Sequence, residues 1–268
     1  MSAPPPHPLL ASLLPVKPDN ELLLWNGKTS VSLSPQDIEA ILARARSGDF
    51  WLSHFDIPER TPQRTLALAI DPETGDSVLH IAATFTGEPL RVEEVIRQTD
   101  VMTCGQDRSS AARLGALETV LVHQNNAGDS CLHVAARGGW QKAVTYLYRA
   151  FCVHESRDYP DVTDSPARER DSYLVEFEEL DDWTVDHVCA KRLAFLLLPN
   201  SARQTAADVA RSAGHVKVAA WLENIATLLN PGGHFTAQNI PQVIEEAQWK
   251  FDDQDIASEI NRNYEDAL

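Results

Sequence analysis

The sequence is poor in cysteine and in long apolar runs. Its 268 residues include four cysteines, and no two of them stand at the two-residue separation typical of zinc knuckles and redox motifs. No stretch approaches the ~20 apolar residues that a membrane-spanning helix needs. The first residues, Met-Ser-Ala-Pro-Pro-Pro, lack the basic leader of a secretory signal. We therefore expect a soluble protein of a reducing compartment, in the cytoplasm or the nucleus, with no membrane partner.

Basic residues are also few. The chain has 23 Lys and Arg against 39 Asp and Glu, which gives a formal net charge of -16 and a pI near 4.9. Sequence-independent binding of DNA or RNA depends on cations that neutralise phosphates, so this balance opposes a direct nucleic-acid partner. It favours a basic protein partner, while the alternative is that the acidity only keeps the chain soluble.

The motifs of common catalytic and metal sites are missing as well. The sequence has no Gly-rich phosphate loop with a lysine, no Gly-x-Ser-x-Gly elbow and no His-Glu-x-x-His helix. Cys152 and His154 stand close together, but a structural zinc ion needs four ligands. The sequence therefore predicts a protein that is not an enzyme, with no catalytic residue, no metal and no cofactor.

What the chain does contain is a repeated phrase. The first copy is Thr74-Gly-Asp-Ser-Val-Leu-His-Ile-Ala-Ala83, and the second is Ala127-Gly-Asp-Ser-Cys-Leu-His-Val-Ala-Ala136. A third and looser copy reads Asn200-Ser-Ala-Arg-Gln-Thr-Ala-Ala-Asp-Val-Ala210. Each copy is followed by apolar residues at helical spacing. Such a phrase predicts a repeat architecture of stacked, equivalent units.

These phrases resemble the ankyrin repeat, whose signature joins a glycine turn, Thr-Pro-Leu-His-x-Ala-Ala and a second helix. The resemblance implies an all-α solenoid of helix-turn-helix units. It also implies that His80 and His133 hydrogen-bond the backbone of a neighbouring turn rather than bind a metal. In the third copy Arg203 replaces the turn glycine and Asp208 replaces the histidine.

The spacing of the copies indicates interruptions, because ankyrin units recur at about 33 residues. His80 and His133 are 53 residues apart, and 75 residues separate His133 from Asp208. Residues 183–198 fit one lone helix better than a degenerate unit. The expected organisation is a Pro-rich leader at 1–20, a capping region with a small β-hairpin at Asn26-Gly27 and a capping helix from Ser34 at 21–60, a repeat domain at 61–230 with units near 71–98, 125–150 and 200–228 and insertions at 99–121 and 151–182, and an acidic helical tail with a capping helix at 231–268.

The resemblance places a recognition surface on the turn tips and on the outer side of each first helix. The inward positions are Leu79, Ile81, Ala82, Leu132, Val134, Ala135, Val209 and Ala210. The expected protein-binding residues are Glu73, Thr74, Asp76, Thr84, Asn126, Asp129, Arg137, Ser201, Gln204 and Arg211. The predicted function is that of an adaptor, inhibitor or chaperone for another protein.

An acidic and aromatic stretch, residues 155–186, leaves two interpretations open. It contains six carboxylates between Glu176 and Asp186, interleaved with Phe177, Leu180 and Trp183. It is either a surface for a basic protein or a loop whose aromatic side chains pack on the repeats. The alternative function is an enzyme or effector whose active site lies in the insertions, with the repeats recruiting the substrate.

Overall fold

The computed structural model describes residues 34–49, 69–85, 89–100, 120–152, 182–236 and 238–243. These residues are mostly helical, and the only bridge among them is an isolated one between Ile70 and Ser77. The helices are α2 (Pro35–Ser47), α4 (Val78–Thr84), α5 (Pro89–Asp100), α7 (Cys131–Gly138), α8 (Gln141–Cys152), α10 (Asp182–Leu196), α11 (Ala206–Ser212) and α12 (Val216–Leu229). The predicted hairpin at residues 21–33 and the leader lie outside the described residues.

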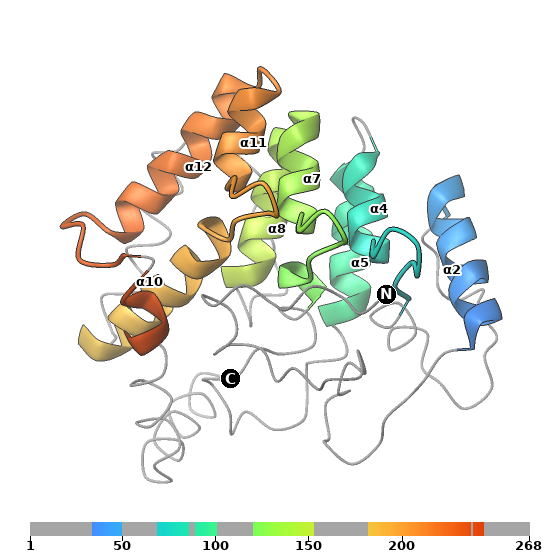
Figure 1. Cartoon of the computed structure of the whole chain (residues 1–268), viewed down its shortest axis with the longest axis horizontal. Coiled ribbons are helices and arrows are strands. Elements are labelled where there is room, and N and C mark those ends of the chain that lie inside the picture. Colours follow the sequence, from blue (N-terminus) through green and yellow to red (C-terminus); the bar gives the residue numbers. More distant parts are fainter. Residues whose placement is uncertain are drawn as a thin grey trace, which may run out of the picture.

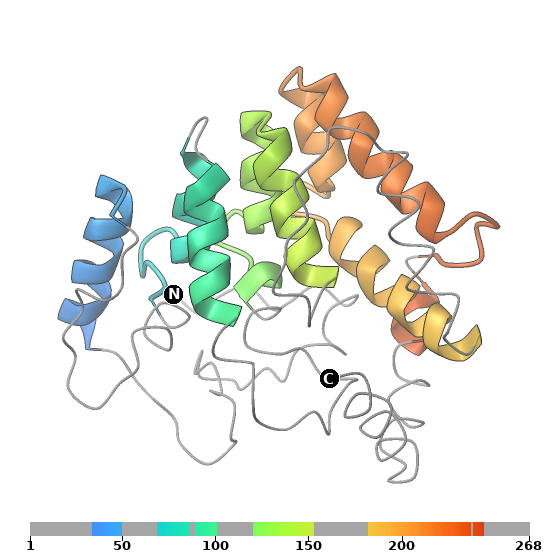
Figure 2. The ribbon, with the colours of Figure 1, turned by 180° about the vertical axis from the view of Figure 1, so that it is seen from behind.

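Helix pairs stack side by side in chain order, from α2 at one end to α12 at the other (Figure 1). The short helices α4, α7 and α11 pack on one another and form one layer, and α5, α8 and α12 form a second layer, which Figure 2 shows from behind. Each short helix packs on the long helix that follows it in the chain. The described chain is thus an all-α stack of equivalent two-helix units, as the repeated phrase predicted.

The insertions do not separate the repeat units from one another. α7 packs directly on α4 and α11 packs directly on α7, although 53 and 75 residues separate the equivalent positions. α10 is a single helix that contacts α8 and α12 in the second layer, and no unit stands between α7 and α11. This arrangement agrees with the lone-helix interpretation of residues 183–198.

Two limits of the predicted insertion at 99–121 are corrected by the structure. α5 continues to Asp100, and Val120 and Leu121 are already buried in the core. The two residues directly precede the second turn in the chain, so their apolar side chains pack with the repeats. The rest of that insertion and the one after α8 lie outside the described residues.

Small residues allow the close packing of the first layer. Alanines on the facing sides of these helices are at most 1% exposed, namely Ala82, Ala83, Ala135, Ala136 and Ala210. A methyl side chain lets two helix backbones approach more closely than a larger one would. The predicted inward positions are buried except Val134, which is partly buried and packs on the edge of the core.

Aromatic residues pack between the helices of the second layer. Phe151 at the end of α8 stacks on Phe195 of α10 with ring centroids 4.3 Å apart. Tyr148 meets Trp221 of α12 edge to face at 5.8 Å. These contacts attach α10 and α12 to α8. None of the helices in the described ranges is long and apolar enough to span a bilayer.

The helical segments at both ends of the stack start at the residues that the sequence predicted. α2 starts at Ser34, whose hydroxyl accepts the N–H of Asp37, and it ends at Gly48 in the left-handed region. At the other end, Thr236 and Asn239 bind each other reciprocally and cap the short helical segment at residues 240–243. Ile240 is fully buried against the core. The part of the tail beyond residue 243 lies outside the described residues.

Candidate protein-interaction surface

Each repeated phrase starts its helix with a reciprocal cap. In the first unit, the backbone N–H of Ser77 donates to Nδ1 of His80 at 3.3 Å, and the Ser77 hydroxyl lies 2.7 Å from the same nitrogen. Ser130 and His133 repeat this arrangement at 3.2 and 2.8 Å. A backbone N–H can only donate, so Nδ1 carries no proton and Nε2 carries it.

The protonated nitrogen of each histidine reaches the next unit. Nε2–H of His80 donates to the carbonyl of Asp129 at 2.9 Å, and that of His133 donates to the carbonyl of Gln204 at 3.1 Å. Each histidine therefore joins its own helix cap to the following turn, as the resemblance implied. Asp208 caps Thr205 in the third unit.

Burial keeps these imidazoles neutral. Burial, together with a smaller contribution from the nearby His123, lowers the pKa of His80 to about 4. The rings of His80 and His123 meet edge to face with centroids 5.6 Å apart. Burial also lowers the pKa of His123 and of His133. Protonation would place a second proton on Nδ1, facing the N–H that now donates to it, so the neutral form fits the site.

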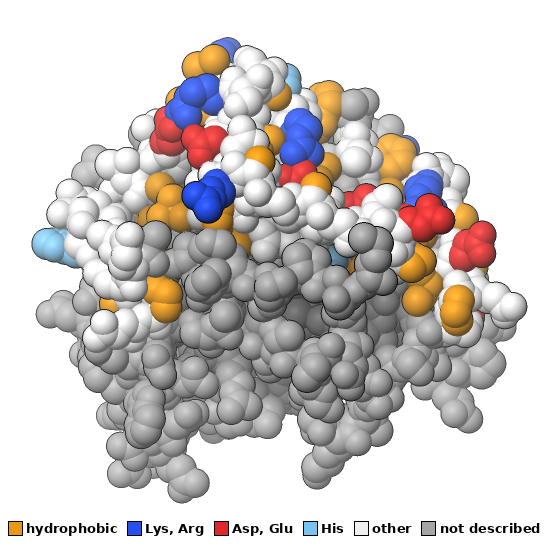
Figure 3. Space-filling model, viewed as in Figure 1, with side chains coloured by type: hydrophobic (Ala, Val, Ile, Leu, Met, Phe, Trp, Pro, Cys, Tyr) orange, Lys and Arg blue, Asp and Glu red, His pale blue; other side chains and the backbone are white. Residues whose placement is uncertain are grey.

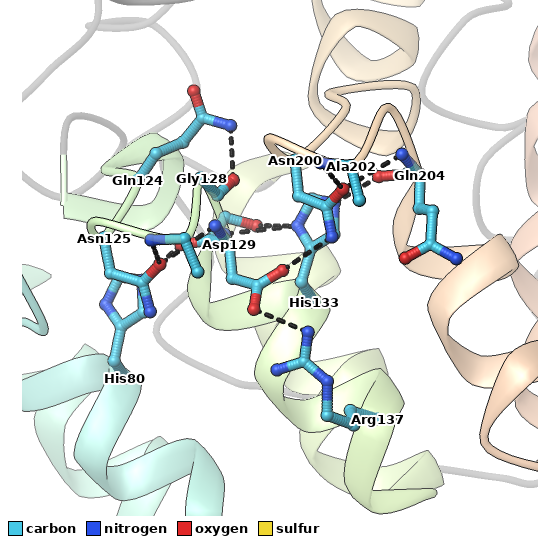
Figure 4. Close-up of polar contacts among 12 residues, drawn as sticks. His80, Gln124, Asn125, Gly128, Asp129, His133, Arg137, Asn200, Ala202 and Gln204 are labelled. Atoms are coloured by element: carbon cyan, nitrogen blue, oxygen red, sulfur yellow. Dashed lines mark hydrogen bonds and ion pairs between the residues drawn. The ribbon is translucent and has the colours of Figure 1, made fainter. Parts of the chain in front are cut away.

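Two asparagines connect the turns to one another (Figure 4). The side-chain oxygen of Asn125 accepts the N–H groups of Ala127 and Asp129, both at 3.0 Å, while its nitrogen donates to the Asp76 carboxylate at 2.7 Å. Asn200 repeats this pattern one unit later and donates to the Asp129 carboxylate at 2.9 Å. Each asparagine shapes its own turn and binds the turn before it.

The turn tips are also bonded through their backbones. The N–H of Asn126 donates to the carbonyl of Thr74 at 2.9 Å, and the N–H of Ser201 donates to the carbonyl of Ala127 at 3.1 Å. The Asn126 amide donates further to the carbonyl of Glu73. Three successive tips therefore form one continuous row.

Most of the predicted binding residues lie on this row and on the adjacent first-layer helices. The exposed ones are Glu73, Thr74, Thr84, Asn126, Arg137, Ser201 and Arg211. Asp76 and Gln204 are partly buried, because they face the following and preceding turns. The prediction that Asp129 is an exposed binding residue is wrong. Its side chain is 4% exposed, because Asn200 and Arg137 bind its two carboxylate oxygens.

Ion pairs balance the charge of this face. Arg137 binds the Asp129 carboxylate at 2.6 Å. Arg211 pairs with Glu223, and Arg46 of α2 pairs with the buried Asp71. Figure 3 shows cationic and anionic side chains interspersed over these helices. The described part of this face is therefore not a single acidic patch.

Asp71 starts the first turn as Asn125 and Asn200 start the later ones. Its carboxylate accepts the N–H groups of Glu73 at 2.8 Å and Thr74 at 3.3 Å. Burial alone would raise the pKa of Asp71, but these hydrogen bonds and the nearby Arg46 outweigh burial and lower it. The carboxylate is therefore fixed in its charged form by the turn that it shapes.

Sequence reasoning missed the residues that connect the turns. Asn125 and Asn200 each stand five positions before a capping Ser130 or Thr205, and this shared spacing is a signal that alignment of the copies reveals. His123, whose Nε2 lies 2.8 Å from the carbonyl of Gly75, has no counterpart in the other copies.

Within the described part of the chain, no three His, Cys, Asp or Glu side chains converge into a group that could bind a metal ion. Cys131 and Cys189 are buried and form no disulfide. Burial raises the pKa of the Cys131 thiol, whose sulfur lies 3.4 Å from the carbonyl of Leu121. The neutral thiol serves as a small packing residue.

Comparison with known proteins gives one structural similarity. No protein-family model matches the sequence, and no curated protein matches it. The chain is similar to a chain in the crystal structure of the yeast ribosomal protein Rps3 in complex with its chaperone Yar1. That match has a TM-score of 0.44 and 18% identity, and it covers 70% of this chain and 92% of that chain.

Proposed function

We propose that the chain is an ankyrin-repeat protein that binds another protein as an adaptor, inhibitor or chaperone and catalyses no reaction. The observation that carries this proposal is the continuous row of turn tips. Asn125 and Asn200 satisfy the backbone N–H groups of their turns internally, so the tips are rigid without a ligand. Because the backbone of the row is already ordered, binding costs little backbone conformational entropy, which favours recognition of a partner.

The proposed partner is a basic or mixed-charge protein, and the distribution of charge supports this choice. The described residues contain 14 Asp and Glu and 12 Lys and Arg, a formal net charge of -2, so -14 of the total -16 lies in the remaining sequence. Residues 153–181 contain ten acidic and three basic residues, and residues 244–268 contain eight and two. In this proposal the repeats make the specific contacts, and the acidic segments attract a basic partner.

A narrower form of the proposal is a chaperone in the cytoplasm or the nucleus that shields a basic ribosomal or nucleic-acid-binding protein. Such a client would attract nucleic acid until it is assembled, and an acidic chain would compete with that nucleic acid for the cationic surface. Affinity for the client should then fall steeply as ionic strength rises.

The test combines partner identification with two matched variants. The partner is identified by cross-linking and mass spectrometry in cells and is then titrated against purified protein. Thr84→Lys/Ala202→Lys adds two positive charges at exposed positions of the first layer and a turn tip, whereas Ala220→Lys/Asn224→Lys adds the same charge to exposed positions of α12. Both variants should unfold at the same temperature as the wild type.

We expect the first variant to weaken binding at least about tenfold, which corresponds to ~1.4 kcal/mol, and the second to change it less than about twofold. Equal affinities for the two variants would reject the turn row as the binding surface. A partner that is acidic, or an affinity unchanged between low and high salt, would reject a basic client.

A further inference from the structure

A single arginine occupies the middle of the first layer. Arg137 lies in the last turn of α7, and its side chain is 50% exposed. Its Nη2 donates to the carboxylate of Asp129 at 2.6 Å, and that carboxylate is only 4% exposed. Asn200 of the next unit binds the other oxygen of the same carboxylate (Figure 4). The guanidinium is therefore fixed in place by two successive units.

The equivalent positions in the neighbouring units are small and neutral. Alignment of the copies places Thr84 of α4 and Ser212 of α11 at the position of Arg137. Both residues are exposed. The Thr84 hydroxyl donates to the carbonyl of Ile81 at 2.7 Å, and the Ser212 hydroxyl lies 3.4 Å from the Gln204 amide nitrogen. The three aligned positions, Thr84, Arg137 and Ser212, form a line across the described units that carries a hydroxyl, a cation and a hydroxyl.

The chemistry of this line points to an anionic group of planar shape. A guanidinium has five N–H donors in one plane, and the Asp129 carboxylate accepts from Nη2, while the Arg137 side chain stays 50% exposed. Because the side chain is already fixed, a partner carboxylate that meets it orders no further rotamers. A nucleic-acid phosphate is disfavoured by the overall charge of -16.

We propose that Arg137 anchors an acidic side chain of the protein partner. This anchor lies at the centre of an interface that runs along the first layer from Thr84 to Ser212. This inference rests on the proposed function and narrows it. The partner is then a mixed-charge protein, basic enough to be attracted by the acidic segments and carrying an Asp or Glu where it crosses the first layer. The anchored carboxylate sets the register of the partner on the stack, as charged pairs at interfaces do.

The experiment uses a defined probe, a random twelve-residue peptide library displayed on phage and selected against the full chain. We expect the selected peptides to share one Asp or Glu. A synthetic peptide in which that residue is replaced by Asn or Gln should bind about tenfold more weakly, which is ~1.4 kcal/mol. Arg137→Gln, which keeps a donor for Asp129, should give the same loss, and the two changes together should lose no more than either alone.

A charge swap and a matched control sharpen the result. Arg137→Glu should recover affinity for the peptide in which the acidic residue is replaced by Lys. Lys217→Gln removes an exposed cation from α12 in the second layer, and it should leave affinity within about twofold. Thermal melts of the Arg137 variants establish that they are folded at the assay temperature.

Several outcomes overturn the inference. Peptides without a shared acidic residue, a selection that yields no peptide, or losses that add independently each reject Arg137 as the anchor. Hydrogen exchange of the unbound wild type and Arg137→Gln tests a competing occupant: a change in residues 244–268 would assign the carboxylate to the chain itself. If the affinity for the protein partner still falls in Thr84→Lys/Ala202→Lys in any of these cases, the proposed function is retained and only the role of Arg137 is rejected.

Discussion

The first two turns of the stack differ from the last one at equivalent positions. Gly75 and Gly128 both adopt a φ of +76°, and Arg203 adopts +61° at the same place in the third turn. A Cβ on Gly128 would lie 2.4 Å from the backbone nitrogen of Ser201, and one on Gly75 would lie 2.8 Å from that of Asn126. Arg203 is exposed. Glycine is therefore required where another turn packs on it, and the left-handed backbone alone does not require it.

The caps differ in the same way. His80 and His133 each bind the carbonyl of a following turn, whereas Asp208 binds Thr205 and Arg211 of its own unit. Among the described units, the third has no further turn stacked on its tip. The departures of the third copy from the repeated phrase thus mark the end of the row rather than decay of the repeat.

The largest expected effect comes from Gly128→Ala. The new Cβ would meet backbone atoms of the next turn, which no side-chain motion relieves. Together with the positive φ, this should lower the free energy of unfolding by about 3 kcal/mol or more in urea titrations. Arg203→Ala is the matched control and should change it by less than about 0.5 kcal/mol. A Gly128→Ala protein as stable as the wild type would show that the turns are not packed together.

Removal of a bridging histidine should have the next largest effect. His133→Ala deletes the bond to Gln204, the cap of Ser130 and a buried ring, so we expect a loss of roughly 2–4 kcal/mol. Asp208→Ala deletes a helix cap and a long, exposed ion pair with Arg211, and it should cost about 1 kcal/mol. Chemical denaturation of both variants at neutral pH measures the difference. Equal losses would contradict a role of the histidine between units.

The buried histidines also predict a pH dependence. The folded pKa of His80, about 4, lies below its ordinary value of 6.5, so the unfolded chain binds more protons between these values. Stability should be fully present above pH ~6.5 and should fall as the pH drops toward ~4, by up to about 1.4 kcal/mol per pH unit for this one residue. Denaturation curves of wild type and His80→Asn across this range test the assignment. An equal slope in the variant would remove His80 as the cause.

The smallest expected effect is a gain. Arg203→Gly relieves the left-handed strain of a residue with a Cβ but adds freedom to the unfolded chain, so the net stabilisation should be about 0.5 kcal/mol. Differential scanning calorimetry resolves a shift of this size. A loss of stability would indicate that the Arg203 side chain makes a contact on which the last turn depends.

The sequence was sufficient for the fold because its strongest signals are local. Ser77, Ser130 and Thr205 start helices at the predicted places, since each is followed three residues later by a side chain that completes the cap. The repeated alanines predicted the close first layer for the same reason. These features depend on short spacings that are visible along the chain.

The surface was harder to predict because it depends on which turns are neighbours. Asp129 looks like an exposed turn residue in sequence, and it is buried because Asn200, 71 positions later, binds it. The charge balance of the exposed face was also not visible from the overall composition, since the pairing of Arg46 with Asp71 and of Arg211 with Glu223 depends on packing. Contacts across long insertions have no local signature.

Cysteine cross-linking of the turn tips tests most directly whether successive turns are neighbours despite the insertions. Thr74 and Asn126 are joined by a backbone hydrogen bond, as are Ala127 and Ser201. The account predicts that Thr74→Cys/Asn126→Cys and Ala127→Cys/Ser201→Cys form disulfides rapidly in the folded protein, as mapped by mass spectrometry, and that Thr74→Cys/Ser201→Cys does not. A third pair that closes as fast as the first two, or first pairs that stay reduced, would contradict the stack.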